Sequence, residues 1–141
     1  MVVTYTAVVS VDGEGRNGGR VHSSDGLLET SLAVPKELGG AGTATNPEQL
    51  LAAGWAACFL GALRRAATLR KIKLTSTTIT AEITLTHGDD GEFNLSATLN
   101  PTLGGVDQNT ATELAHAAHQ ICPYSKATRD NIPVTINATA A

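Results

Sequence analysis

The stretch Asn46–Leu63 reads NPEQLLAAGWAACFLGAL, and it decides the fold. Its first residue is an asparagine, which is a favoured helix N-cap, and Pro47 suits the first helical position. Glu48 falls in the first turn, where the helix dipole favours a negative charge. The residues that follow are almost wholly apolar or small. The sequence therefore predicts a helix from about Pro47 to about Arg70 that is buried, or packed on both sides.

Strands are expected on both sides of this helix, because β-branched residues and apolar–polar alternation recur there. Three are predicted before the helix, with glycine-rich loops around them: Val2–Val11, Arg20–Ser24 and Leu28–Val34. After the helix, Thr78–Thr86 alternates cleanly, and a second alternating strand begins at Phe93. The Gly88–Gly91 segment between these two has the composition of a hairpin turn.

A second helix is expected near the end of the chain. Asp107 or Asn109 would cap it, and it would run to about Cys122, where Pro123 ends or kinks it. A last strand is predicted at Val134–Asn137. Strands, a helix, a hairpin, a helix and a strand in this order indicate an α+β fold rather than a doubly wound parallel sheet. The length of 141 residues predicts a single domain over residues 1–141.

Charge and hydropathy narrow the function classes. The net charge is −3 and no long run of lysine or arginine is present, which argues against nucleic acid and acidic membrane surfaces as partners. The N-terminus has no secretion-signal pattern, and no window is expected to reach the roughly 18 apolar residues of a membrane span. A cytoplasmic location is therefore expected, where two cysteines are reduced at rest and a transient catalytic disulfide is allowed.

The two cysteines, Cys58 and Cys122, have two interpretations. Free cysteine is often an inert buried residue, and 64 residues of separation are no motif by themselves. A reactive cysteine must ionise to the thiolate. Because burial raises the pKa of a thiol, a positive charge or hydrogen bonds must lower it. The cations in glycine-rich sequence are Arg16 and Arg20, and a buried arginine in turn needs an anion, for which Glu48 is a candidate.

The spacing of Glu48 and Cys58 adds a constraint. They lie ten residues apart on one predicted helix, or about 15 Å along its axis. A straight helix therefore cannot bring both to one site. We expect a homodimer in which two central helices run antiparallel, so that Glu48 of one subunit approaches Cys58 of the other.

Two rival functions remain open from the residues alone. His116, His119 and Cys122 are spaced i, i+3 and i+6, and Cys58 could complete a zinc site, although the i+6 position turns away from i on a regular helix. A non-enzymatic binding module with two inert cysteines is the other rival. His22 and His87 fit loop or strand-end positions.

Several motifs, in order along nearly the whole chain, resemble the Ohr branch of the Ohr/OsmC superfamily. They are Ser23-Ser24-Asp25-Gly26, Pro35-Lys36-Glu37-Leu38-Gly39-Gly40, Thr45-Asn46-Pro47-Glu48-Gln49-Leu50, Ala56-Ala57-Cys58-Phe59 and Ala118-His119-Gln120-Ile121-Cys122-Pro123-Tyr124-Ser125. The family's Gly-Arg-Asp-Gly loop matches Gly15-Arg16-Asn17-Gly18 best, with Asn17 in place of aspartate and Arg20 as the alternative arginine.

The resemblance implies an intertwined homodimer of α+β chains, with antiparallel sheets around a long central buried helix. It implies a peroxidase that reduces organic hydroperoxides, including lipid-derived ones, to alcohols. Cys58 would be the peroxidatic cysteine and Cys122 the resolving one, with Arg16 and Glu48 in catalytic roles. No bound cofactor is implied, and the reductant would be a dihydrolipoyl group on a lipoylated protein. An OsmC-type peroxidase of broader substrate range is the alternative within the superfamily.

Overall fold

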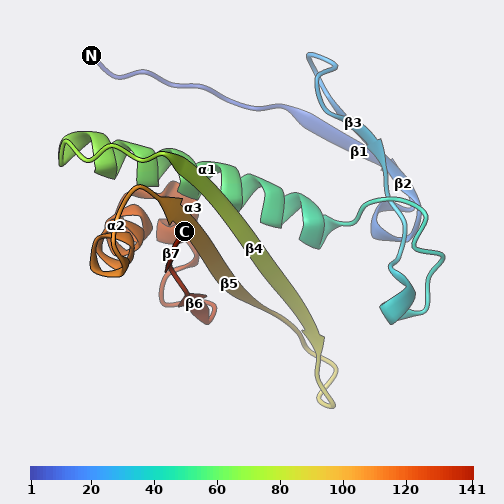
Figure 1. Ribbon diagram of the computed structural model, residues 1–141. Helices are drawn as coiled ribbons and strands as arrows, with labels where there is room; N and C mark the ends of the chain where they lie inside the picture. Colours follow the sequence, from blue (N-terminus) through green and yellow to red (C-terminus); the bar gives the residue numbers. More distant parts are fainter. The chain divides into compact units, whose positions relative to one another are not determined.

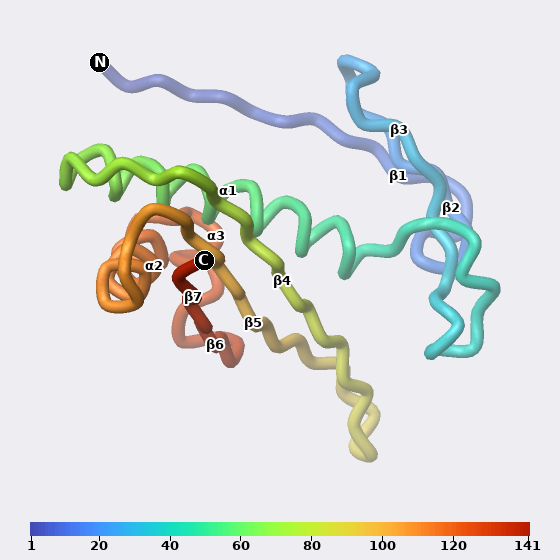
Figure 2. Tube along the Cα trace, viewed as in Figure 1, coloured from blue at the N-terminus to red at the C-terminus, as the bar shows by residue number.

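The computed structural model describes residues 1–141, which form two compact units, Met1–Leu50 and Leu51–Ala141. The expectation of a single domain stays a prediction. Figure 1 labels the helices and strands, and Figure 2 traces the chain from end to end.

The first unit is built on a three-stranded antiparallel sheet in the order β1-β2-β3. A 3₁₀ turn at Gly15–Asn17 joins the first two strands, and another lies at Lys36–Leu38. Gly15 and Gly18, which flank the first turn, have φ angles of 59° and 143° that suit glycine. The strands are β1 (Val9–Gly13), β2 (Gly19–Ser23) and β3 (Glu29–Ser31).

Two predicted strands are shorter than expected. The strand predicted at Val2–Val11 begins only at Val9, because the pairing with β2 starts at Val9↔Ser23. The preceding residues run extended (Figure 2) with exposed valine and tyrosine side chains. The strand predicted at Leu28–Val34 shrinks to β3, after which Leu32 keeps only an isolated bridge to Thr45.

Helix α1 spans Pro47–Leu69, close to the prediction. Its cap is also as predicted, since the Gln49 backbone N–H donates to Asn46 Oδ1 at 2.9 Å. By length and composition alone, α1 is long and apolar enough to cross a membrane, which corrects the expectation that no window approaches such a span. The core helix of a soluble protein meets the same criterion, which makes this weak evidence for a membrane span.

The second unit contains a long antiparallel hairpin of β4 (Ser76–His87) and β5 (Phe93–Gly104), as predicted. Strands β6 (Val134–Ile136) and β7 (Thr139–Ala140) both pair with β5 in parallel. This sheet is therefore mixed rather than antiparallel throughout. The cause is topological, because the chain returns to β5 through two helices rather than through a tight turn.

Those two helices are α2 (Gln108–Ile121) and α3 (Pro123–Thr128). Asp107 is the cap of α2, and its side chain accepts a hydrogen bond from the Thr110 backbone N–H at 2.8 Å. Pro123 ends α2 and occupies the first turn of α3, so the stretch expected to be irregular or helical is a short helix.

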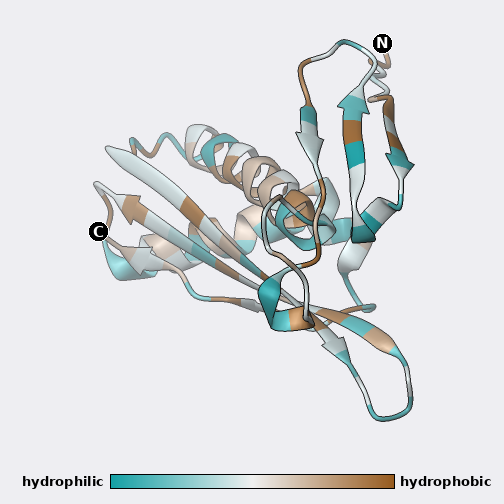
Figure 3. Ribbon diagram, turned by 90° about the vertical axis from the view of Figure 1, so that its right-hand side faces the viewer, coloured by the Kyte–Doolittle hydropathy of each residue, from teal (hydrophilic) through white to brown (hydrophobic).

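The core of the second unit lies between α1, α2 and β5. Its largest fully buried side chains include Trp55, Phe59, Leu63, Leu99 and Leu114. One chain covers only part of α1, since 33% of its apolar window is buried, so a single chain does not meet the expectation that α1 is buried or packed on both sides. Figure 3 colours much of this helix in the white-to-brown range of neutral and hydrophobic residues.

Candidate functional site

In the first unit, Arg16 and Glu48 form a two-pronged ion pair. Arg16 Nη1 donates to Glu48 Oε2 at 2.8 Å, and Arg16 Nη2 donates to Oε1 at 2.6 Å. The guanidinium comes from the turn between β1 and β2, and the carboxylate from the first turn of α1. The Glu48 side chain is 15% exposed and that of Arg16 is 38% exposed, so the anion is the better shielded of the two.

The pair keeps both groups charged. The hydrogen bonds from Arg16 hold the pKa of Glu48 below its usual value, against a smaller opposing effect of burial. Those same bonds raise the pKa of Arg16. Because the Glu48 pKa is lower in the folded chain, the pair stabilises the fold above the unfolded carboxyl pKa. This contribution is lost as the pH falls through the folded value.

Arg20, the alternative arginine, has a different partner. It lies on β2, and its Nη2 donates to Glu29 Oε1 at 2.8 Å on the exposed surface of the sheet. Of the two arginines singled out from the sequence, the structure therefore joins only Arg16 to Glu48.

In the second unit, the side chains of Cys58 and Cys122 lie together. Both thiols are free, with Cys58 half-buried on α1 and Cys122 fully buried between α2 and α3. Burial raises the pKa of Cys58, and the neighbouring Cys122 side chain raises that pKa further. The Tyr124 backbone acts in the opposite direction and lowers the pKa of Cys58.

The break between α2 and α3 holds Cys122 in this place. Cys122 is the residue between the two helices, and Pro123 begins the second. One turn further, the indole N–H of Trp55 donates to Ser125 Oγ at 3.3 Å in the buried core. This hydrogen bond joins α1 to α3, and each of its two residues lies three positions from a cysteine in the sequence.

Tyr124 packs against α1 beside this hydrogen bond. A methyl group added at Gly54 would lie 3.0 Å from Tyr124 Oη and 3.2 Å from its Cε2, which is tighter than ordinary contact. Gly54 lies four residues before Cys58 and so on the same helix face. The absence of a side chain at position 54 thus leaves room for the tyrosine ring next to the thiol.

Sequence reasoning did not assign roles to Gly54, Trp55, Tyr124 or Ser125. Two signals were present in the sequence. Gly54 stands one helical turn before Cys58, and Tyr124 and Ser125 directly follow Cys122-Pro123. Neither signal predicts the Trp55–Ser125 hydrogen bond, because it joins residues 70 positions apart.

The structure does not assemble the zinc site considered from the sequence. No three His, Cys, Asp or Glu side chains of the chain are grouped so that they could hold a metal ion. His119 Nδ1 is buried without a hydrogen-bond partner, and burial lowers the pKa of this histidine. The Arg129 guanidinium donates to the backbone carbonyl of His119 rather than to its ring.

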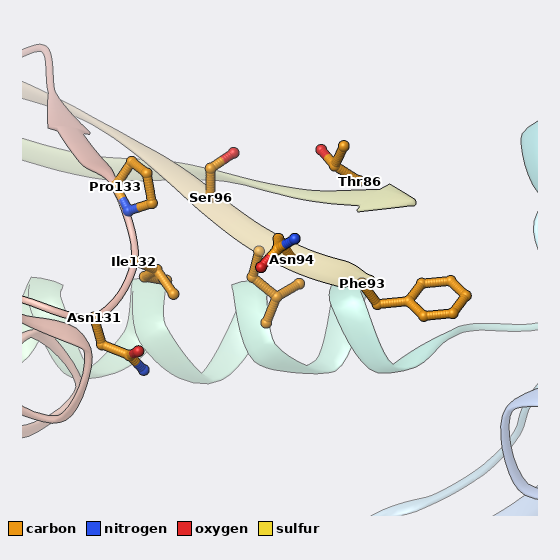
Figure 4. A pocket seen from close by; sticks show the side chains of 8 residues that line it. Thr86, Phe93, Asn94, Ser96, Asn131, Ile132 and Pro133 are labelled. Carbon is orange, nitrogen blue, oxygen red and sulfur yellow. The ribbon is translucent and has the colours of Figure 1, made fainter. Parts of the chain in front are cut away.

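A groove of 590 Å³ lies elsewhere in the second unit, between the hairpin and the segment before β6. Figure 4 shows Phe93 at one end of it and Asn131 and Pro133 at the other. None of the four predicted site residues lines this groove. Its size alone therefore does not make it the site of the chemistry.

The fold and its pair of adjacent free thiols define the class, an α+β protein with a dithiol centre beside a long helix. The chain belongs to the family described as OsmC-like protein, whose family model matches residues 40–137. This confirms the superfamily resemblance drawn from the motifs.

Individual relatives place the chain near the Ohr proteins. It is 45% identical to the organic hydroperoxide resistance protein of Xanthomonas axonopodis pv. citri, over 95% of this chain and 94% of that protein. It is 41% identical to the organic hydroperoxide resistance protein OhrB of Bacillus subtilis, over 94% of this chain and 96% of the relative.

A solved structure agrees with these relatives. The crystal structure of an organic hydroperoxide resistance protein from Legionella pneumophila superposes with a TM-score of 0.91 at 42% identity. The match covers 98% of this chain and 99% of the other. The α+β fold predicted from the sequence is therefore confirmed.

Proposed function

We propose that this chain is a thiol-dependent peroxidase that reduces organic hydroperoxides to alcohols and so protects the cell against them. The observation that carries the proposal is a pair of free thiols, with Cys58 packed against the core cluster that contains Cys122, in a chain whose relatives are named for organic hydroperoxide resistance. The apolar side chains around Cys58 suit alkyl and lipid-derived peroxides better than hydrogen peroxide.

The first requirement is a Cys58 thiolate. Burial works against it, since it raises the pKa of Cys58 in the single chain. A guanidinium near a thiol favours the charged form, and Arg16 is a cation that Glu48 already orients. In our proposal, Arg16 stabilises the Cys58 thiolate and Glu48 is the positioning residue that holds the guanidinium.

The peroxide step transfers one oxygen atom. The thiolate attacks the oxygen distal to the organic group, an S–O bond forms and the O–O bond breaks. The alkoxide leaves and takes up a proton to become the alcohol. Cys58 is thereby oxidised to a sulfenic acid, and the peroxide is reduced by two electrons.

The second thiol closes the cycle. The Cys122 sulfur condenses with the Cys58 sulfenic acid, forming a disulfide and releasing water. This prevents further oxidation of Cys58. A dihydrolipoyl dithiol on a lipoylated protein then reduces the disulfide by thiol–disulfide exchange and becomes the cyclic disulfide itself. No bound cofactor is needed for these steps, and we propose that they take place in the cytoplasm.

A second copy of the chain is the partner that we propose for α1. The helix has more apolar surface than its own chain covers, with Ala53 and Ala57 exposed among half-buried neighbours. The extended N-terminal residues likewise expose Val2, Val3 and Tyr5. An intertwined homodimer with antiparallel α1 helices would cover such surfaces and would allow Glu48 of one subunit to approach Cys58 of the other.

Steady-state turnover tests the proposal. Purified protein is mixed with an alkyl hydroperoxide and either dihydrolipoamide or a monothiol, and alcohol formation is followed. We expect multiple turnovers with dihydrolipoamide, much slower turnover with the monothiol, and faster reaction with alkyl peroxides than with hydrogen peroxide. Equal rates with all peroxides would favour an OsmC-type enzyme of broader range, and no disulfide after peroxide treatment would favour a binding module.

A further inference from the structure

The segment just beyond the apolar half of α1 is densely basic. Five of the chain's ten cations lie within residues 64–73, and no aspartate or glutamate occurs from residue 49 to residue 81. The remaining five cations accompany all 13 acidic residues, so the rest of the chain carries a balance of −8 against +5 for this segment. The small net charge of the whole chain had concealed this separation. The five residues, here called the basic segment, are Arg64, Arg65, Arg70, Lys71 and Lys73.

All five side chains of the basic segment are exposed. The salt bridges of the chain involve Arg16, Arg20 and His22, so no member of the segment has an acidic partner. Arg70 shares a shallow groove with Glu113, without an ion pair between them. Cations at the end of α1 are favoured by its dipole, which accounts for Arg70 and Lys71 but not for the others.

The basic segment starts close to the thiol centre along the same helix. Arg65 follows Cys58 by seven residues, which is two turns and about 10 Å along the axis. Seven residues bring the helix back to nearly the same face. In the proposed antiparallel dimer, moreover, the two basic segments lie at opposite ends of the helix pair and do not repel each other.

We propose that the basic segment is the docking surface for an acidic face on the protein that carries the reducing dithiol. This deepens the proposed function, because it rests on a protein-borne dithiol as reductant. Complementary charge would raise the encounter rate and orient the dithiol arm toward Cys58 and Cys122. An acidic protein fits better than nucleic acid or an anionic membrane, since the −8 balance elsewhere repels an extended polyanion.

The test compares a protein reductant with a small one. The probe is an isolated lipoyl-bearing domain of net negative charge, kept in its dithiol form, and free dihydrolipoamide is the small reductant. Arg65→Glu and Lys73→Glu, singly and together, reverse charges that make no side-chain hydrogen bond in the chain. Lys36→Glu is the matched control, because Lys36 is an exposed cation in the other unit.

We expect the double variant to raise the KM for the lipoyl-bearing domain about tenfold at low ionic strength, with a smaller effect at high salt. Its turnover with free dihydrolipoamide should match that of the parent, which also shows that it is folded. Lys36→Glu should change neither. Calorimetric binding of the domain to the oxidised protein should weaken in parallel, and this readout does not depend on turnover.

An unchanged KM and affinity for the domain in the double variant would overturn the proposal. Charge-dependent sedimentation of the parent with phosphatidylglycerol vesicles, without charge-dependent binding of the domain, would also overturn it and assign the segment to lipid. Failure of dihydrolipoamide to support any turnover of the parent would instead refute the proposed function, while the binding measurement would still decide on the docking surface.

Discussion

The turn that carries Arg16 and the helix junction that carries Cys122 hold their functional groups in different ways. Arg16 is partly exposed and is fixed by two charge-assisted hydrogen bonds to Glu48. Cys122 is fully buried and is placed by the Pro123 break and by packing against α1. The first arrangement keeps charges formed, whereas the second keeps two thiols close together and raises the pKa of Cys58.

Each region lacks what the other one has. The thiol pair has two adjacent sulfurs, but burial raises the pKa of Cys58. The ion pair has an oriented guanidinium, but no nucleophile among its hydrogen-bond partners. A peroxidase needs both properties at one sulfur atom. In the proposed function the two regions therefore divide the labour, and each prediction alters one region and leaves the other intact.

The largest effect is expected from Cys58→Ser. Serine keeps the volume of the side chain close to that of cysteine but cannot form a thiolate, so peroxidase activity should fall to background. Alcohol formation from an alkyl hydroperoxide measures it, and circular dichroism checks the fold. If this variant turned over like the parent, the assignment of Cys58 as the nucleophile would be wrong.

Cys122→Ser should separate the first oxidation from the rest of the cycle. Cys58 can still attack the peroxide, but no disulfide can form within the chain. We expect one alcohol per subunit in a rapid phase, followed by a stall with Cys58 as sulfenic or more oxidised acid. Mass spectrometry of the intact chain measures this state. Sustained turnover with dihydrolipoamide would contradict the resolving role.

Arg16→Gln tests whether the charged region serves the thiols. Loss of the guanidinium should reduce kcat/KM for an alkyl hydroperoxide about 100-fold, the order expected for one oriented charge near a thiolate. Arg20→Gln is the matched control, because Arg20 pairs with Glu29 on the exposed sheet surface and should leave the activity unchanged. A larger loss of kcat/KM in the Arg20 variant than in the Arg16 variant would show that Arg20, and not Arg16, stabilises the Cys58 thiolate.

The smallest effect is expected from Ser125→Ala. This substitution leaves the buried indole N–H of Trp55 without its acceptor, which should reduce the free energy of unfolding by about 1–3 kcal/mol. Urea denaturation measures the change, with the exposed Ser24→Ala as control. Slower disulfide formation after peroxide should accompany it, if this hydrogen bond helps to hold Cys122 in place. Equal free energies of unfolding for the two variants would show that the Trp55–Ser125 hydrogen bond does not stabilise the fold.

The sequence was most informative where local rules apply. Alternation predicted the β4–β5 hairpin, and the cap at Asn46 predicted the start of α1, because both depend on neighbouring residues. The N-terminal strand was predicted too long, since its length depends on pairing with β2 rather than on β-propensity. The burial of α1 was overestimated for a related reason, because apolar composition does not tell which surfaces the same chain covers.

The candidate site shows the same limit. Motif resemblance singled out Arg16, Glu48, Cys58 and Cys122, and the structure pairs the first two and brings the last two together. The loop motif favoured Arg16 but left Arg20 open, and the contacts to Glu48 and Glu29 tell the two arginines apart. The parallel pairing of β6 and β7 with β5 could not be predicted from local sequence either, because it depends on the path of the chain through two helices.

The most direct test of the proposed division of labour is the pH dependence of Cys58 alkylation by iodoacetamide in the reduced protein. Peptide mass spectrometry resolves Cys58 from Cys122, and the parent is compared with Arg16→Gln. We predict a midpoint below the ordinary thiol value of about 8.5 in the parent and an upward shift of at least about one pH unit in the variant. A midpoint above the ordinary value that is the same in both proteins would show that Arg16 does not ionise Cys58.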